Sequence, residues 1–205
     1  MDEYDCWCVV TRFVKNKEYD KAIAFCETEP YSTLQYCQNY LGWTFYQQEK
    51  YEISAYWFGK AADQNNGEAS FGMGSILMIQ HDFRGALSRL MDSVNNGYSR
   101  AYFWIALIYY YGGNGVSQDI EQAIRYFKIG ADHESLMAER FMLFIESRRG
   151  WRERVTSWVR MIPLLIKAWV ISARNPYDFR VVDIDYQFEG EFSNPDYKPA
   201  QIYNK

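Results

Sequence analysis

Apolar residues recur along the chain at helical spacing, and the whole pattern returns after 32, 32 and then 37 residues. Four segments, CQNYLGWTFYQQ, ASFGMGSILMIQ, AYFWIALIYYYG and AERFMLFIESRR, align so that Cys37, Ala69, Ala101 and Ala138 share one column. The first three of these segments are each followed by a second apolar segment with the same helical spacing, such as KYEISAYWFGKAAD and DIEQAIRYFKIGAD. A period of this length with two helical segments per unit is typical of helical repeats. The pattern therefore predicts a series of helix pairs.

Small residues keep a fixed place in both helices of each predicted pair. The two columns contain Gly42, Gly74 and Ala106 in the first helices, and Ala22, Ser54, Ala86 and Ala123 in the second helices. Small residues at a crossing let antiparallel helices approach closely, while large neighbours interdigitate around the contact. One pair cannot bury its apolar face alone, so the pairs must stack. We predict an all-α, right-handed superhelical solenoid over residues 1–147.

The repeat resembles the Sel-one-like repeat family, which is related to the tetratricopeptide repeats. Its units combine an A-x-x-x-L-G-x-x-Y first helix, a G-x-G-V-x-x-D turn and an A-x-x-W/Y-Y/F-x-K-A-A second helix. Residues 101–131 and 37–62 match best, whereas the unit between them lacks the Gly-rich turn. The matching residues are Ala101, Tyr109, Gly113, Gly115, Val116, Asp119, Ala123, Tyr126, Phe127, Lys128 and Ala131, with Leu41, Gly42, Trp57, Phe58, Lys60, Ala61 and Ala62. The resemblance implies a non-catalytic interaction module.

A partner would bind the concave face of such a solenoid, where first-helix residues that are not used in packing are displayed. Counting from the small-residue column as in tetratricopeptide units, the predicted partner-binding residues are Tyr36, Asn39, Trp43, Tyr46, Glu68, Phe71, Ser75, Met78, Arg100, Phe103, Leu107 and Tyr110. Aromatic residues with a polar fringe are typical of protein-binding surfaces. The alternative for each aromatic residue is burial between helices, and the sequence leaves that choice open.

The most apolar stretch of the chain runs from Val155 to Ala173. Arg160 and Lys167 divide it, and the uncharged run between them is far shorter than the roughly 20 residues that a membrane span needs. We therefore predict that residues 148–174 form a helix that caps the solenoid or folds back into its groove, and that the chain does not engage a membrane. A helix lying in a membrane interface is the alternative.

The last 31 residues, 175–205, are predicted to be an extended tail. Alternating apolar and polar residues in FRVVDIDYQFEGEF indicate a short amphipathic strand. Such a strand needs a neighbour, which leaves open the pairing of two chains as a homodimer through this tail. Alternate carboxylates such as Asp183 and Asp185 share one solvated face, so we predict no metal site there.

Composition narrows the classes of partner. The net charge of −4 argues against a nucleic-acid-binding protein, which needs excess Lys and Arg on one face. The basic run SRRGWRERVTSWVR is interpreted as a solvated helix start, with an acidic protein surface as the alternative partner. The N-terminal segment lacks the features of a secretory signal, so we expect a cytoplasmic protein. Four cysteines, Cys6, Cys8, Cys26 and Cys37, lack zinc-site spacing and are predicted to be reduced packing residues.

No catalytic or cofactor-binding motif is recognisable. The GGNGV loop matches neither a phosphate-binding loop nor a dinucleotide fingerprint, and it accounts for the longer third interval. His81 and His133 have no nucleophile–base signature near them and are interpreted as turn or surface residues. We predict no enzyme, no cofactor and no metal. The predicted function is an adaptor or scaffold that binds a protein partner. The alternative is an immunity protein that neutralises a cognate bacterial toxin by occluding its active site.

Overall fold

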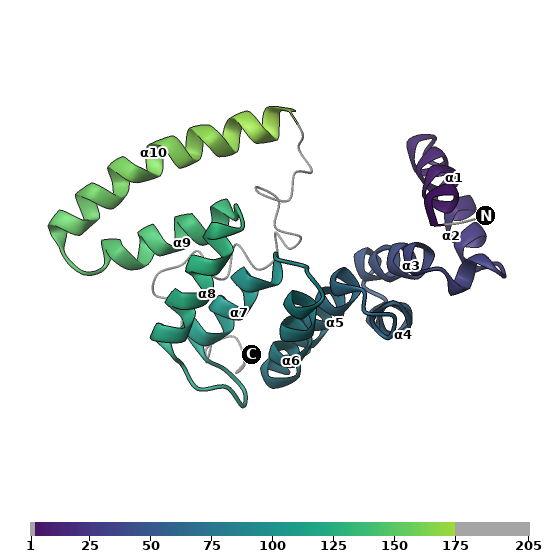
Figure 1. The fold of residues 1–205 in the computed structure, drawn as a ribbon, viewed down its shortest axis with the longest axis horizontal. Helices are drawn as coiled ribbons and strands as arrows, with labels where there is room; N and C mark the ends of the chain where they lie inside the picture. The colour runs from purple at the N-terminus through teal and green to yellow at the C-terminus, as the bar shows by residue number, and fades with distance from the viewer. Residues whose placement is uncertain (1–2, 175–205) are drawn as a thin grey trace. The chain divides into compact units, whose positions relative to one another are not determined.

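The computed structural model describes residues 3–174, and within that range the protein is entirely helical in its regular structure (Figure 1). The elements are α1 (Glu3–Lys15), α2 (Tyr19–Glu27), the 3-10 turn η1 (Tyr31–Thr33), α3 (Gln35–Gln47), α4 (Tyr51–Ala62), α5 (Gly67–Ile79), α6 (Phe83–Asn95), α7 (Ala101–Tyr111), α8 (Ile120–Asp132), α9 (Leu136–Ser147) and α10 (Trp151–Arg174). The predicted all-α solenoid of helix pairs is confirmed. The predicted strand and tail lie outside the described residues.

The helices form two compact units, which divide between Tyr98 and Ser99. The first unit contains the pairs α1–α2, α3–α4 and α5–α6, and the second contains α7–α8 and α9–α10. Inside each unit the partners of a pair contact one another, and α4 contacts α5 just as α8 contacts α9. The predicted segment 148–174 corresponds to α10, which follows α9 after a three-residue turn.

The turns repeat as regularly as the helices. The turn inside each pair of the first unit has one residue in the left-handed region, namely Lys17, Glu49 and His81, with φ of 61°, 59° and 61°. In each, the left-handed residue and its successor donate backbone hydrogen bonds to carbonyls three and five residues earlier, as Glu49 does to Tyr46 and Lys50 to Phe45. This is the Schellman arrangement that ends a helix. His81 is thus an exposed turn residue, as the sequence indicated.

The Gly-rich loop between α7 and α8 is a connection inside one pair. Gly113 and Val116 exchange two backbone hydrogen bonds of 2.9 Å. Asp119 donates its N–H to the Tyr109 carbonyl, and its side-chain Oδ1 caps α8 by accepting a hydrogen bond from the Gln122 N–H. Gly112 has φ of 68°, and a Cβ there would lie 2.8 Å from the backbone nitrogen of Gln118. The loop therefore requires a glycine at position 112, and the backbone groups of Gly113, Val116 and Asp119 are used to close the turn.

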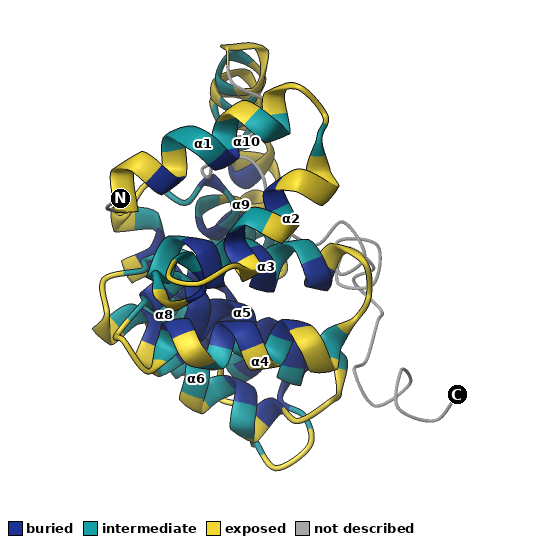
Figure 2. Ribbon diagram, turned by 90° about the vertical axis from the view of Figure 1, so that its right-hand side faces the viewer, coloured by how far each residue is buried: buried dark blue, intermediate teal, exposed yellow. Residues whose placement is uncertain are grey.

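A close crossing of three helices in the first unit is built around Phe58 of α4. Its fully buried ring lies against Gly42 of α3 on one side and Gly72 of α5 on the other. A Cβ atom at either glycine would stand 2.5 Å from a ring carbon. Ser54 adds a hydrogen bond of 2.8 Å from its hydroxyl to the Gly42 carbonyl. Figure 2 shows the result, with dark blue buried residues along much of α5. The close approach predicted from the small-residue column is confirmed here.

Three of the four cysteines belong to the core at the N-terminal end. Cys6, Cys26 and Cys37 are buried with Val10 and Leu41, and all four cysteines are free thiols. Burial raises the pKa of the Cys6 thiol from 9.0 to about 11, with Cys37 nearby as the second cause. The thiol is therefore neutral at physiological pH and packs as a small apolar group, as predicted.

The Phe58 crossing gives a direct stability prediction. Gly42→Ala should lower the free energy of unfolding by about 1–3 kcal/mol, because the ring cannot retreat from the new methyl without meeting Gly72. Gly59→Ala is the matched control in α4, since a Cβ there meets nothing within 4 Å and alanine favours the helix. Chemical denaturation followed by circular dichroism compares the two, and equal stability of both variants would contradict the crossing argument.

The Cys6 thiol predicts a loss of stability in alkaline solution. Because its folded pKa exceeds its unfolded value, its contribution is complete below pH 9 and disappears as the pH rises through about 11. The free energy of unfolding should therefore decline more steeply over this window in the native chain than in Cys6→Ala. Cys8→Ala, at a half-buried position in the same helix, serves as the control and should retain the native slope.

Candidate partner-binding site

The twelve predicted partner-binding residues divide evenly by exposure. The buried six are Tyr46, Phe71, Ser75, Met78, Phe103 and Leu107, and the half-buried six are Tyr36, Asn39, Trp43, Glu68, Arg100 and Tyr110. Phe71 is 1% exposed and packs against Trp43 and Tyr98, with ring centroids 6.2 and 5.3 Å away. Phe103 is 6% exposed and packs against Phe127 at 5.8 Å. Phe71 and Phe103 thus stabilise the helix pairs, and the half-buried six are three aromatic residues and three polar or charged ones.

Three of the half-buried residues meet in one pocket of the first unit. Tyr36 and Asn39 come from α3 and Glu68 from α5, and the pocket has a volume of about 500 Å³. Its other lining residues are Glu3, Gln35, Gln64 and Asn66. Trp43 does not line the pocket, but its indole N–H donates a hydrogen bond to Glu68, which does. Arg100 and Tyr110 belong to the second unit, where Tyr110 packs its ring against Phe141 at 5.2 Å.

Glu3 forms one wall of this pocket by capping a neighbouring helix. Its two carboxylate oxygens accept hydrogen bonds from the backbone N–H groups of Gln35 at 2.8 Å and Tyr36 at 2.9 Å. These are the first residues of α3, whose own N-cap position, Leu34, has no side chain that can accept. A negative charge at a helix N-terminus also interacts favourably with the helix dipole. The contact therefore attaches α1 to α3 at the edge of the pocket.

An amide network next to the pocket connects α3 with the turn between α4 and α5. Gln35 Nε2 donates to the Gln64 carbonyl at 2.8 Å, and Gln64 Nε2 donates to Gln38 Oε1 at 2.8 Å. Gln38 is buried and donates in turn to the Ser32 carbonyl at 2.9 Å. Gln38 uses both the donor and the acceptor of its amide, while Gln35 and Gln64 each donate into the same network, so the three side chains hold one another in position. The pocket floor is thus organised before any partner binds.

The remaining pocket groups are mostly hydrogen-bond acceptors. Glu68 Oε1 accepts from Trp43 Nε1 at 3.0 Å, and the Trp43 ring meets Phe58 edge-on at 4.9 Å, so the carboxylate is held by a packed side chain. Asn39 Oδ1 is buried and has no hydrogen-bond partner in the described structure. Leaving a buried acceptor unsatisfied costs about 1–3 kcal/mol. Asn39 is also one of the residues that line the pocket.

Tyr36 lines the pocket, and its hydroxyl is hydrogen-bonded to Thr11 of α1. Burial raises the pKa of its hydroxyl to about 12, and a hydrogen bond with Thr11 opposes that rise. The hydroxyl therefore remains protonated at every physiological pH. The Glu3 and Glu68 carboxylates and the Asn39 oxygen make the site rich in hydrogen-bond acceptors. Such a site suits a cationic or amide side chain.

A second pocket lies within the second unit, among α8, α9 and α10. Its volume is about 580 Å³, and its lining residues are Lys128, Ala131, Asp132, Glu139, Met142, Leu143, Arg160, Pro163 and Leu164. No predicted binding residue is among them. Within residues 3–174, no group of three or more His, Cys, Asp and Glu side chains is placed to hold a metal ion. Asp183 and Asp185 lie outside the described range.

Four residues of the first pocket were absent from the prediction: Glu3, Gln35, Gln64 and Asn66. They lie at helix ends and in turns, whereas the prediction considered positions along the first helices. One signal was available, because Glu3 and Gln35 occupy the same column of the 32-residue repeat, directly before Tyr4 and Tyr36. A polar residue repeated at that position indicates a role at the start of the helix. It does not reveal which neighbouring helix it contacts.

Comparisons with known proteins agree with the repeat architecture. A family model described as Sel1 repeat matches residues 35–66 and 99–135, which contain α3–α4 and α7–α8. Among solved structures, a protective antigen present in uropathogenic Escherichia coli strains, displaying an SLR fold, shares 20% identity and a TM-score of 0.69. The match covers 80% of this chain and 38% of the antigen, so this chain spans well under half of that protein.

A Sel1 repeat protein from Oxalobacter formigenes is also similar, with 18% identity and a TM-score of 0.47 over 90% of this chain and 95% of that one. No curated protein matches this chain. At these levels of identity the likeness to solved structures concerns the fold.

The Glu3 contact can be tested separately from partner binding. Glu3→Gln removes the charge and one acceptor, so the Gln35 and Tyr36 amides should exchange hydrogen faster and stability should fall by about 1 kcal/mol. Hydrogen exchange followed by mass spectrometry or NMR measures the first effect. Glu52→Gln, at an exposed position of α4, is the control. Unchanged protection of both amides would show that the cap contributes nothing in solution.

Proposed function

The chain belongs to the Sel-one-like repeat family, and from that premise we propose that its first unit binds a protein partner through the pocket lined by Tyr36, Asn39 and Glu68. Sel1 repeat proteins are generally protein-interaction modules, and such repeat families are generally non-catalytic. The pocket is a narrower and more polar site than the aromatic groove that the sequence predicted. Its action in this chain would be recognition, in the role of an adaptor or scaffold.

The observation that carries the proposal is the unpaired oxygen of Asn39. A partner that inserts an N–H donor would remove the cost of that buried acceptor, so part of the binding free energy is already stored in the free protein. The carboxylates of Glu3 and Glu68 are held in place by backbone and indole donors and retain further acceptor capacity. A pocket fixed in advance loses little conformational entropy on binding.

The partner should present a donor-rich segment. A lysine, arginine or glutamine side chain that enters the pocket would meet acceptors on α1, α3 and α5, and an aromatic or aliphatic neighbour would cover the half-buried Tyr36 ring. The chain's net charge of −4 adds a long-range attraction for a basic partner. This chemistry favours a protein segment over a nucleic acid, whose phosphates would be repelled.

The narrower alternative is that the partner is a bacterial toxin, which the chain would neutralise by covering its active site. The same acidic, acceptor-rich pocket supports it, because enzymes that act on nucleic acids or other anions have basic active sites. The two roles share one site and differ in the effect on the partner. A cytoplasmic setting is part of both proposals.

Asn39→Ala separates binding from folding. Removing an unsatisfied buried acceptor should leave the free energy of unfolding unchanged or raise it, whereas partner affinity should fall about tenfold, which corresponds to one hydrogen bond. Phe71 and Phe103 are poor choices for this purpose, because both are buried and their truncation would disturb the fold. Asn95→Ala, at an exposed position near the end of α6, is the matched control.

The measurement is affinity capture of the tagged full-length chain from its native lysate, followed by calorimetric titration of the captured protein with each variant. Equal affinity of the native chain and Asn39→Ala would remove the pocket from the proposal. Should the captured partner be an enzyme, its activity is assayed with the native chain and with the variant. Inhibition by the native chain alone supports the immunity role, and unchanged activity supports the adaptor role.

A further inference from the structure

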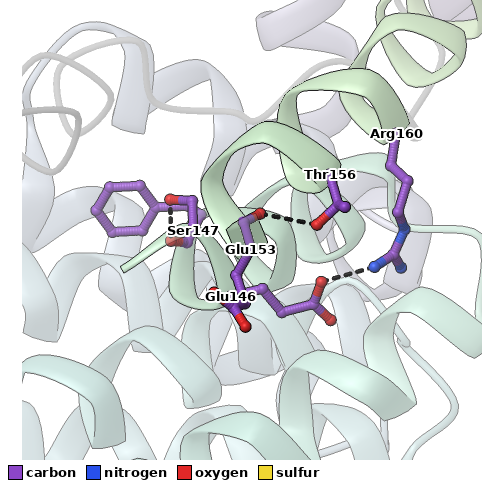
Figure 3. Close-up of polar contacts among 6 residues, drawn as sticks. Glu146, Ser147, Glu153, Thr156 and Arg160 are labelled. Atoms are coloured by element: carbon purple, nitrogen blue, oxygen red, sulfur yellow. Dashed lines mark hydrogen bonds and ion pairs between the residues drawn. The ribbon is translucent and has the colours of Figure 1, made fainter. Parts of the chain in front are cut away.

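Helix α10 has two apolar faces, and only one of them is used in packing. It contacts α9, which is half its length, and extends past it (Figure 1). Apart from Val170, the less exposed positions form one stripe: Ser157, Met161, Leu164, Ala168 and Ile171. Ser157 is buried, and Arg160 Nη1 lies 2.6 Å from Glu146 Oε2 of α9 (Figure 3). This face matches the capping role predicted for residues 148–174.

The other face carries large apolar side chains that are exposed. At alternating spacings of four and three residues it presents Trp151, Val155, Trp158, Ile162, Leu165 and Trp169, with Val159 and Ile166 beside them. The three tryptophans are 72%, 68% and 72% exposed. A continuous apolar stripe of this length on a protein surface marks an interaction site.

Basic residues line one edge of this exposed stripe. With about 3.6 residues per turn, Arg152, Arg160, Lys167 and Arg174 fall on the same side of the helix, next to the tryptophans. The whole helix holds five basic residues and one acidic residue, although the chain as a whole is acidic. An amphipathic helix with tryptophan on its apolar face and Lys or Arg on its polar face is typical of binding at the surface of an anionic bilayer.

We propose that α10 binds the surface of a membrane that contains anionic lipids, with its axis parallel to the bilayer. The tryptophan stripe lies at the boundary between headgroups and acyl chains, where the indole ring is favoured. The basic edge, including Arg152 and Lys167, contacts the anionic headgroups. The stripe that contains Ser157 continues to pack on α9, so the second unit is held at the membrane through α10.

The structure favours this orientation over a spanning helix. Among residues 3–174, α10 alone is long and apolar enough to cross a membrane by length and composition. Spanning would separate Ser157 and Met161 from α9 and break the ion pair between Arg160 and Glu146. It would also place Arg160 and Lys167 near the bilayer centre, where each basic residue is strongly unfavourable. Surface binding preserves every one of these contacts.

Charge also argues against a second copy of the chain as the occupant of the stripe. In an antiparallel pairing of two α10 helices, the basic edge of one would face the basic edge of the other. Anionic headgroups instead complement Arg152, Lys167 and Arg174 on that edge, while Arg160 keeps its ion pair with Glu146. The occupant that matches both the apolar stripe and its basic edge is therefore an anionic lipid surface.

Vesicle binding of the full-length protein tests the proposal. Flotation and tryptophan fluorescence compare vesicles of phosphatidylcholine alone with vesicles that also contain phosphatidylglycerol. We expect at least about tenfold tighter binding to the mixed vesicles, weakening at high salt, with a blue shift of the tryptophan emission. Equal binding to both vesicles, or binding to neither, would overturn the proposal.

Two pairs of variants connect the effect to α10. Replacing Trp151, Trp158 and Trp169 together by alanine should abolish binding without loss of helicity, because all three are exposed. The control is Trp7→Ala, which removes an exposed tryptophan from α1. Arg152→Gln with Lys167→Gln should weaken binding about tenfold, whereas Lys15→Gln with Arg84→Gln, at exposed positions elsewhere, should not.

Extraction and self-association distinguish the other occupants. Protein on anionic vesicles should be released by high salt or alkaline carbonate, and resistance to both would overturn surface binding in favour of a spanning helix. Light scattering measures the mass of the free protein. A dimer that dissociates in Val155→Lys with Ile162→Lys, combined with a lack of vesicle binding, would assign the stripe to a second copy. None of these outcomes depends on the pocket around Asn39.

Discussion

The position of the Phe58 ring between Gly42 and Gly72 sets the distance between α3, α4 and α5, and the candidate site depends on it. Tyr36 and Asn39 reach the pocket from α3 and Glu68 reaches it from α5, so the two helices must lie close together for the pocket to exist. A side chain at either glycine would separate them. A single close crossing in the core therefore defines the size of a polar site at the surface.

Aromatic and polar residues have different tasks in the first unit. The rings of Phe58, Phe71 and Trp43 pack against one another and determine how the helix pairs stack. Polar groups at the helix ends, including Glu3 and Gln64, then connect one pair to the next across the pocket. High aromatic content, at 19% of the chain, thus mainly serves stacking of short helices, which otherwise have little apolar surface each.

The two candidate surfaces have opposite chemistry. The pocket of the first unit is rich in acceptors and carries the carboxylates of Glu3 and Glu68, so it attracts donors and positive charge. Helix α10 in the second unit is basic and exposes an apolar stripe, which is the chemistry that the proposed anionic lipid surface would match. The two proposed functions therefore rest on different residues, in different units of the chain. The net charge of −4 does not reveal this difference between the two surfaces, because it sums the charges of the whole chain.

The sequence by itself determined the helix pairs, the 32-residue period and the glycine at the α3–α4 crossing, because each is a local or periodic signal. It also predicted Tyr36 and Glu68 from one column of the repeat and Asn39 from another, and these three residues line the pocket. Only the tertiary structure decided that Phe71 and Phe103 are buried, because an aromatic ring is equally suited to a core and to a binding surface. The apolar stretch of α10 shows the same ambiguity. Its sequence contains two apolar stripes, and the contact with α9 selects the one that is buried and leaves the tryptophans of the other exposed.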